Sequence, residues 1–293
     1  MIYLFYIIFF LLGVAIGSFL NVVILRLHTG EKLTGRSHCF NCDRTLSASE
    51  LIPLFSFIFQ RGKCRKCGSR ISWQYPVVEA GTGLLFALIA WPVMSGIDVM
   101  TADFMVWLNT FFSLLIFWAI FSVLMAILVY DLYHLIIPDE LVYTFIGLSL
   151  LSPILSTEPF LSPTVFANLT GLVFPSLSGL AGALLLFGFF WSLWAFSGGR
   201  WMGFGDAKLV IGIGFLLYPV QESLLAVMLA FVIGAVVGVG LLAFNRLSRY
   251  ASKDLTLKTE LPFAPFLILG TLLVFVFGWS FIDLLSLNLY LLG

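Results

Sequence analysis

The sequence predicts an all-α, polytopic membrane protein with about eight transmembrane helices and a small cytoplasmic loop domain. Apolar residues make up 61% of the 293 residues and charged residues only 10%, which leaves too little polar surface for a soluble fold. The apolar residues gather in long runs, and all four cysteines lie in one polar stretch between the first two runs. Together these observations favour a helical bundle in the bilayer with one compact loop module.

The apolar runs define the expected helices, because the bilayer core requires about 20 apolar residues per helix. The chain is apolar from Ile2, and its first basic residue is Arg26, so we expect a permanent first span rather than a cleaved signal peptide. Short spans must tilt or be shielded by their neighbours. The predicted spans are residues 2–25, 76–94, 104–130, 141–155, 171–196, 208–219, 223–244 and 263–280.

The basic residues set the expected orientation. Nine of the 15 Lys and Arg residues lie within residues 26–75, and none lies between residues 76 and 199. The positive-inside rule therefore places the first loop in the cytoplasm. When the following loops alternate from there, every Lys and Arg falls on the cytoplasmic side, and so do Asp131 and Asp206.

The first cytoplasmic loop contains two Cys-x2-Cys pairs, Cys39 with Cys42 and Cys64 with Cys67. Four thiolates suit tetrahedral zinc and leave no open position, so a structural ion is favoured over a catalytic one. Two disulfides are the alternative, but the cytoplasm is reducing. The apolar spacer 51–59 forms either the core of the module or a membrane-surface segment. The predicted domains are the first transmembrane helix (1–25), a cytoplasmic four-cysteine zinc module (26–75) and a transmembrane bundle (76–293).

Two aspartates form the candidate catalytic site. Asp131 ends a long apolar run, and Asp206 stands between two others, at positions where an ionisable group is costly. Two nearby carboxyls can take different catalytic roles in peptide hydrolysis, because one accepts a proton from water while the other polarises the carbonyl. The helix dipole favours an ionised Asp206 near a helix N-terminus and a protonated Asp131 at a helix C-terminus. Alternatively, Asp206 only caps a helix and Asp131 only lies in a polar turn.

Three neighbours of Asp206 are expected to support this site. Gly203 and Gly205 permit the close backbone approach that an extended substrate segment needs. Lys208 either anchors the chain at the membrane surface or neutralises charge near Asp206. Farther away, Glu79 is an acid within the second span, with no obvious partner in the sequence.

These motifs resemble those of the type IV prepilin peptidases, which are membrane aspartic proteases of the Gly-x-Gly-Asp kind. The resemblance covers most of the chain, and it departs from the usual pattern at Ala264, where Gly is more common. It rests on residues 17–26, the paired cysteines, Tyr75-Pro76-x2-Glu79, Asp131 with Ile137-Pro138-Asp139, residues 203–209 and residues 262–266.

The resemblance implies that Asp131 and Asp206 cut the basic leader from type IV prepilins and pseudopilins. It places the enzyme in the bacterial inner membrane, in contact with lipid and with its active site facing the cytoplasm. Family members with the four-cysteine loop also methylate the new N-terminal amine with S-adenosylmethionine, although no residue is assigned to that cofactor. No nucleic-acid partner is expected.

Two other functions remain open from the sequence alone. A cation-coupled transporter would use the two acids for ion coupling, but it predicts acids near the membrane midplane and broken helices in paired halves. A non-catalytic assembly protein of a pilus or secretion system explains the cysteines, but it leaves Gly203, Gly205 and Asp206 without a role.

Overall fold

The structure is a computed structural model that describes residues 2–94, 102–156, 177–217, 220–247 and 262–278. Within these ranges the regular structure is helical apart from two isolated β-bridges, which confirms the predicted all-α class. Outside the described residues lie the parts of the predicted spans and loops at residues 95–101, 157–176, 218–219, 248–261 and 279–280.

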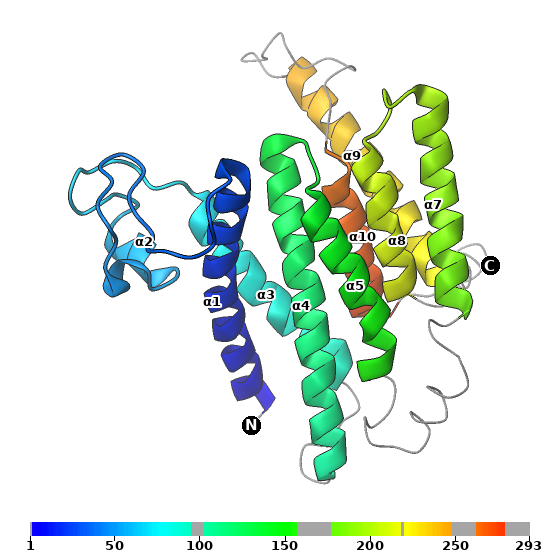
Figure 1. Ribbon diagram of the computed structural model, residues 1–293, viewed down its shortest axis with the longest axis horizontal. Coiled ribbons are helices and arrows are strands. Elements are labelled where there is room, and N and C mark those ends of the chain that lie inside the picture. The colour runs from blue at the N-terminus through cyan, green and yellow to red at the C-terminus, as the bar shows by residue number, and fades with distance from the viewer. Residues whose placement is uncertain (1, 95–101, 157–176, 218–219, 248–261, 279–293) are drawn as a thin grey trace. The chain divides into compact units, whose positions relative to one another are not determined.

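Each of the eight predicted spans corresponds to one helix in the described part of the chain (Figure 1). A 3₁₀ turn, η1 (Ala48–Glu50), and a short helix, α2 (Phe55–Phe59), lie in the cysteine loop. The long helices are α1 (Ile2–Thr29), α3 (Gln74–Met94), α4 (Phe104–His134), α5 (Asp139–Ser156), α7 (Leu177–Ser197), α8 (Phe204–Leu216), α9 (Val220–Leu247) and α10 (Ala264–Phe277).

Among the described residues, five helices are long and apolar enough to cross a membrane, namely α1, α3, α4, α7 and α9. The protein is therefore an integral membrane protein. Two boundaries differ from the prediction at the candidate site. Helix α4 continues to His134, so Asp131 lies inside its last turn rather than after it. Helix α8 begins at Phe204, four residues before the predicted span, because Gly203 adopts an extended N-cap conformation.

The chain folds as two compact units, and α4 contributes to both. The first unit contains Met1–Ala102 and Phe117–Val129, and the second contains Asp103–Ile116 and Tyr130–Gly293. The cysteine loop therefore belongs to the first unit, whereas Asp131 and Asp206 both belong to the second.

In the first unit, α1 packs closely on α3 through small residues. A Cβ atom on Gly13 would lie 2.6 Å from the Thr82 carbonyl oxygen, and one on Gly17 would lie 2.8 Å from the Glu79 Cα. Such spacing lets two helix backbones approach, as the Gly-x3-Gly pattern predicts. Trp118 of α4 stacks on Phe86 at 4.9 Å and donates its indole N–H to the Phe86 carbonyl.

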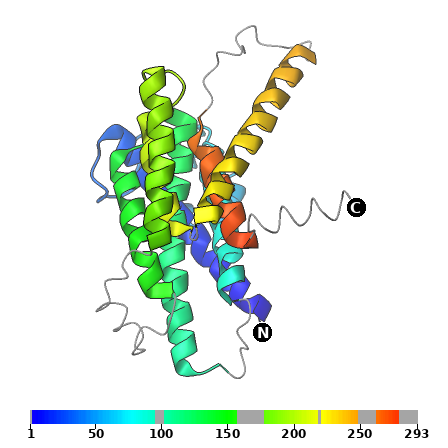
Figure 2. The same cartoon turned by 90° about the vertical axis from the view of Figure 1, so that its right-hand side faces the viewer.

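In the second unit, α8 packs against both α5 and α7. Its glycines make the contacts close, because Gly212 lies under the Phe145 ring of α5 and Gly214 lies against the Ala183 backbone of α7. Helix α10 packs on the N-terminal half of α9 in the same way, with Gly270 against Ala226. Figure 2 shows the C-terminal half of α9 extending away from the other helices of this unit.

Candidate functional site

Asp131 is fixed between the carbonyl end of one helix and the amide end of another. It lies in the last turn of α4 and is only 5% exposed. The backbone N–H of Ala264, the first residue of α10, donates a hydrogen bond to its carboxylate. Its Oδ2 atom is buried and has no hydrogen-bond partner among the described residues. Since buried polar atoms are nearly always paired, this oxygen is available to a water or a substrate group.

Asp206 occupies the first turn of α8 and is 6% exposed. The N–H of Gly203, the N-cap residue, donates to its carboxylate, which is the contact that an acid at the third helical position makes in a capping box. Its Oδ1 atom is also buried without a partner in the described part of the chain. Asp206 thus caps the helix with one oxygen and leaves the other free, so capping and chemistry are compatible.

The two carboxyls lie near enough for their charges to repel each other. Two neighbouring carboxyls cannot both ionise easily, so they share their titration. The second unit thus brings together two acids that are far apart in the sequence. The dipole of α8 favours the charged form of Asp206, whereas Asp131 lies at the unfavourable end of α4.

The neighbours of Asp206 have structural partners within the same unit. A Cβ atom on Gly205 would lie 2.9 Å from the Ile137 Cβ, so the close approach that this glycine permits is to the segment following Asp131. Gly203 has more room, with the nearest atom 3.7 Å away. Lys208 forms an ion pair with Asp139 at the start of α5, a partner that the sequence analysis did not consider for it.

Ala264 is the site residue that the sequence analysis did not assign. It contributes a backbone amide rather than a side chain, and it is fully buried. The apolar motif of residues 262–266 was its only signal, because a main-chain hydrogen bond leaves no characteristic residue type at the donor position. A small residue at position 264 is consistent with this burial.

The cysteine loop forms two matching hairpins, each closed by one β-bridge. In the first, the N–H of Asp43 donates to the Cys39 carbonyl at 2.9 Å, and in the second, the N–H of Gly68 donates to the Cys64 carbonyl at 3.0 Å. Asp43 and Gly68 both have positive φ, at 50° and 70°. The two Cys-x2-Cys pairs therefore lie in turns of the same backbone geometry.

The four thiol groups form a cluster that could hold a metal ion. All four cysteines are free, and their sulfur atoms lie within 4.8 Å of one another. The Cys39 and Cys67 sulfurs are 3.9 Å apart, and a tetrahedron with Zn–S bonds of about 2.3 Å has edges of about 3.8 Å. Hydrogen bonds from Ser69 and Asn41 lower the pKa of Cys67 to about 5, whereas desolvation and hydrogen bonds to Cys39 and Cys67 raise the pKa of Cys42 to about 11. A bound metal ion would favour the thiolate form of all four cysteines.

The apolar spacer between the two hairpins is not the core of this module. Helix α2 has no buried residue, and Ile58 and Phe59 are 68% and 79% exposed. Phe57 is half-buried, and its ring lies 5.0 Å from that of Trp73. Of the two alternatives for this segment, the described residues therefore exclude the buried core.

The helices and these two groups define a polytopic membrane protein that carries a buried carboxyl pair and a four-cysteine cluster. Residues 11–93 match the bacterial peptidase A24 N-terminal domain, and residues 118–239 match the type IV leader peptidase family. The chain belongs to the type IV leader peptidase family, as its similarity to curated relatives along almost its whole length shows.

Three relatives illustrate this similarity, and each is called prepilin leader peptidase/N-methyltransferase. The protein of Bacillus subtilis is 32% identical over 277 residues, which cover 94% of this chain and 96% of the relative. The protein of Aeromonas salmonicida is 28% identical over 308 residues, covering 95% and 92%. That of Pseudomonas aeruginosa is 28% identical over 296 residues, covering 92% and 89%. No solved structure matches the chain.

Proposed function

We propose that this protein cleaves the leader peptide of type IV prepilins and pseudopilins and methylates the N-terminus that cleavage creates. The observation that carries the peptidase assignment is the pair formed by Asp131 and Asp206. Both side chains are buried, their charges interact, and each keeps one oxygen without a partner in the described structure. Family membership and the names of the relatives support the same assignment.

The positions of the two acids at opposite helix ends support a division of roles in cleavage. Asp206, at the amide end of α8, is the ionised base that removes a proton from the attacking water. Asp131, at the carbonyl end of α4, is protonated and donates a hydrogen bond to the scissile carbonyl oxygen. The water oxygen then bonds to the carbonyl carbon, and the scissile C–N bond breaks as the proton that Asp206 removed from water passes to the leaving amine. The amide of Ala264 orients Asp131 throughout.

Family membership supports a location in the bacterial inner membrane, and the distribution of charge supports an active site that faces the cytoplasm. All basic residues fall on one side when the predicted spans alternate from the basic first loop. The proposed substrates are type IV prepilins and pseudopilins, and membrane lipid is the other expected partner. Residues 76–293 form the peptidase bundle, with Gly203, Gly205 and Lys208 supporting its catalytic loop.

The four cysteines hold a structural zinc ion within the module of residues 26–75, which follows the first transmembrane helix (1–25). The sulfur cluster fits zinc in donor type and spacing, and it leaves no ligand position for catalysis. S-adenosylmethionine, when bound, supplies the methyl group for the second activity.

One experiment distinguishes cleavage from methylation. A model prepilin is incubated with the purified protein with and without S-adenosylmethionine, and the products are weighed by mass spectrometry. We expect Asp131→Asn and Asp206→Asn each to slow cleavage by at least about a hundredfold, while the proteins remain folded. Glu140→Gln, an exposed acid in the first turn of α5, is the matched control. Cleavage near the wild-type rate in either Asn variant would remove the assigned mechanism.

A further inference from the structure

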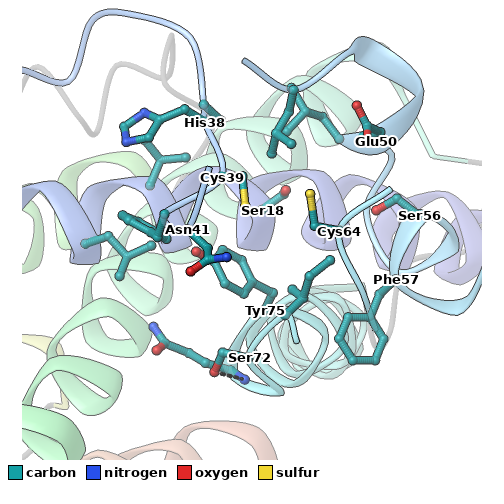
Figure 3. A pocket seen from close by; sticks show the side chains of 18 of the residues that line it. Ser18, His38, Cys39, Asn41, Glu50, Ser56, Phe57, Cys64, Ser72 and Tyr75 are labelled. Carbon is teal, nitrogen blue, oxygen red and sulfur yellow. Dashed lines mark hydrogen bonds between the residues drawn. The ribbon is translucent and has the colours of Figure 1, made fainter. Parts of the chain in front are cut away.

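The first unit contains a cavity of about 420 Å³ that the peptidase mechanism does not use. It lies between the C-terminal half of α1, the cysteine loop and the start of α3 (Figure 3). Cys39 and Cys64 line one part of it, but a single ion enclosed by four thiolates needs only a small fraction of this volume. The cavity falls within the size range of small-molecule binding sites, about 300–1,000 Å³.

A buried carboxylate lines this cavity. Glu79 is 6% exposed, and its Oε2 atom accepts the Leu54 N–H at 2.7 Å. The Ser18 hydroxyl also bonds to it. No cationic side chain pairs with Glu79 among the described residues, whose ion pairs lie elsewhere. A buried carboxylate without a cation is costly, and a positively charged ligand in the cavity would offset that cost.

The other two buried charged residues of the wall already have partners inside the loop. The Arg26 guanidinium donates to backbone carbonyls, at 2.7 Å for Leu33 and 3.1 Å for Lys32. Glu50 binds the Arg44 guanidinium and accepts the Ser47 N–H. Glu79 is therefore the buried wall residue whose charge a ligand would complement.

The backbone contact of Glu79 also holds a strained turn. Leu54 has φ 60° and ψ −53°, and the Phe55 N–H donates to the Pro53 carbonyl at 2.7 Å, which closes a γ-turn with positive φ. This turn type is rare and strained, and strain of this kind collects at ligand clamps. Glu79 thus connects α3 to the part of the cysteine loop that leads into α2.

Much of the remaining wall is apolar and aromatic. The rings of Tyr75 and Phe57 lie at the cavity in Figure 3, and Val22 and Leu25 of α1 add aliphatic surface. Aromatic faces attract both flat ring systems and cations. The cavity therefore suits a small ligand that combines a positive charge with an aromatic group.

We propose that this cavity binds S-adenosylmethionine and that the Glu79 carboxylate faces its positively charged sulfonium end. The assignment rests on the proposed methyltransferase function, and it gives that function a location in the first unit. S-adenosylmethionine combines the required features, since it carries a sulfonium cation and a purine on one small molecule. Its demethylated product, S-adenosylhomocysteine, has the same shape but a neutral sulfur, which makes the pair a direct probe of the carboxylate.

Isothermal titration of the full-length protein in detergent with each of the two compounds tests the site. Glu79→Gln keeps the acceptor for the Leu54 amide and removes only the charge. We expect it to weaken S-adenosylmethionine binding about tenfold and to change S-adenosylhomocysteine binding by less than about threefold. Ser56→Phe, which fills the cavity from α2, should weaken the binding of both compounds, and Glu140→Gln should change the binding of neither.

The outcomes distinguish the site from the function on which it rests. If the wild type binds S-adenosylmethionine and neither Glu79→Gln nor Ser56→Phe changes its affinity, the proposed site is wrong. The methyltransferase function would still stand in that case. An equal loss of affinity for both compounds in Glu79→Gln would show that the charge of Glu79 does not recognise the sulfonium. A wild-type protein that cleaves prepilin but binds neither compound would overturn the methyltransferase function and the site together. Prepilin cleavage by each variant shows that the protein is folded.

Discussion

The Lys208 ammonium group forms an ion pair with the Asp139 carboxylate, so the N-terminal part of α8 is tied to the first turn of α5. The same ammonium lies 5.4 Å from the centre of the Phe204 ring and 5.9 Å from that of Tyr143. Asp206 lies one half-turn before Lys208 on α8. The pair therefore helps to hold the helix end that carries this acid.

We expect Lys208→Met to lower the free energy of unfolding by about 1–2 kcal/mol, because it removes the ion pair and both ring contacts. Asp139→Asn should cost less than about 1 kcal/mol, since the Asp139 side chain is 55% exposed and the ring contacts remain. Unfolding in detergent of the wild type, both single variants and the double variant measures their coupling. A coupling energy of zero would show that the ion pair contributes nothing.

Gly205→Ala should damage the site more than Gly203→Ala does. The new methyl group at position 205 would lie 2.9 Å from the Ile137 Cβ, whereas the one at position 203 meets nothing closer than 3.7 Å. We expect the first change to cost about 1–3 kcal/mol and to slow prepilin cleavage, because the displaced backbone carries Asp206. The second should cost about 1 kcal/mol or less through the helix cap. Equal losses of stability and cleavage in the two variants would contradict this explanation.

Removal of the metal should loosen the cysteine loop and leave the aspartates in place. Elemental analysis should find about one zinc per chain, and Cys39→Ser or a strong chelator should remove it. Hydrogen exchange should then accelerate in residues 37–71, while prepilin cleavage stays within about threefold of wild type. His38→Asn, beside a ligand but outside the cluster, is expected to retain the metal. Protein without zinc but with all four thiols intact would refute the metal site.

Acid should weaken the same loop through Glu50. The Ser47 amide and the Arg44 guanidinium lower the pKa of Glu50 from 4.5 to about 2. Since the folded pKa is the lower one, the stabilisation is complete above about pH 5 and is lost as the pH falls toward 2. Hydrogen-exchange protection of residues 47–51 should differ most between wild type and Glu50→Gln near neutral pH. A difference that stays constant down to pH 3 would exclude the charge as its cause.

Much of the site was predictable from local patterns. Asp131 and Asp206 were identified because a charged residue at the end of an apolar run is conspicuous. The cysteine cluster was identified because two Cys-x2-Cys pairs place four donors within reach of one ion. Glu79 was noticed as a buried acid without an apparent partner, and the partner proved to be a backbone amide, which no residue type reveals.

The sequence by itself determined the number and approximate positions of the membrane helices, because the length of an apolar run is set by the thickness of the bilayer. Only the tertiary structure decided which residues meet across helices, as Gly205 meets Ile137 and Lys208 meets Asp139. The physical reason is that helices such as α3 and α8 have nearly uniform apolar surfaces. In lipid both the packed and the exposed faces of a helix are apolar, so the sequence pattern does not encode its rotation.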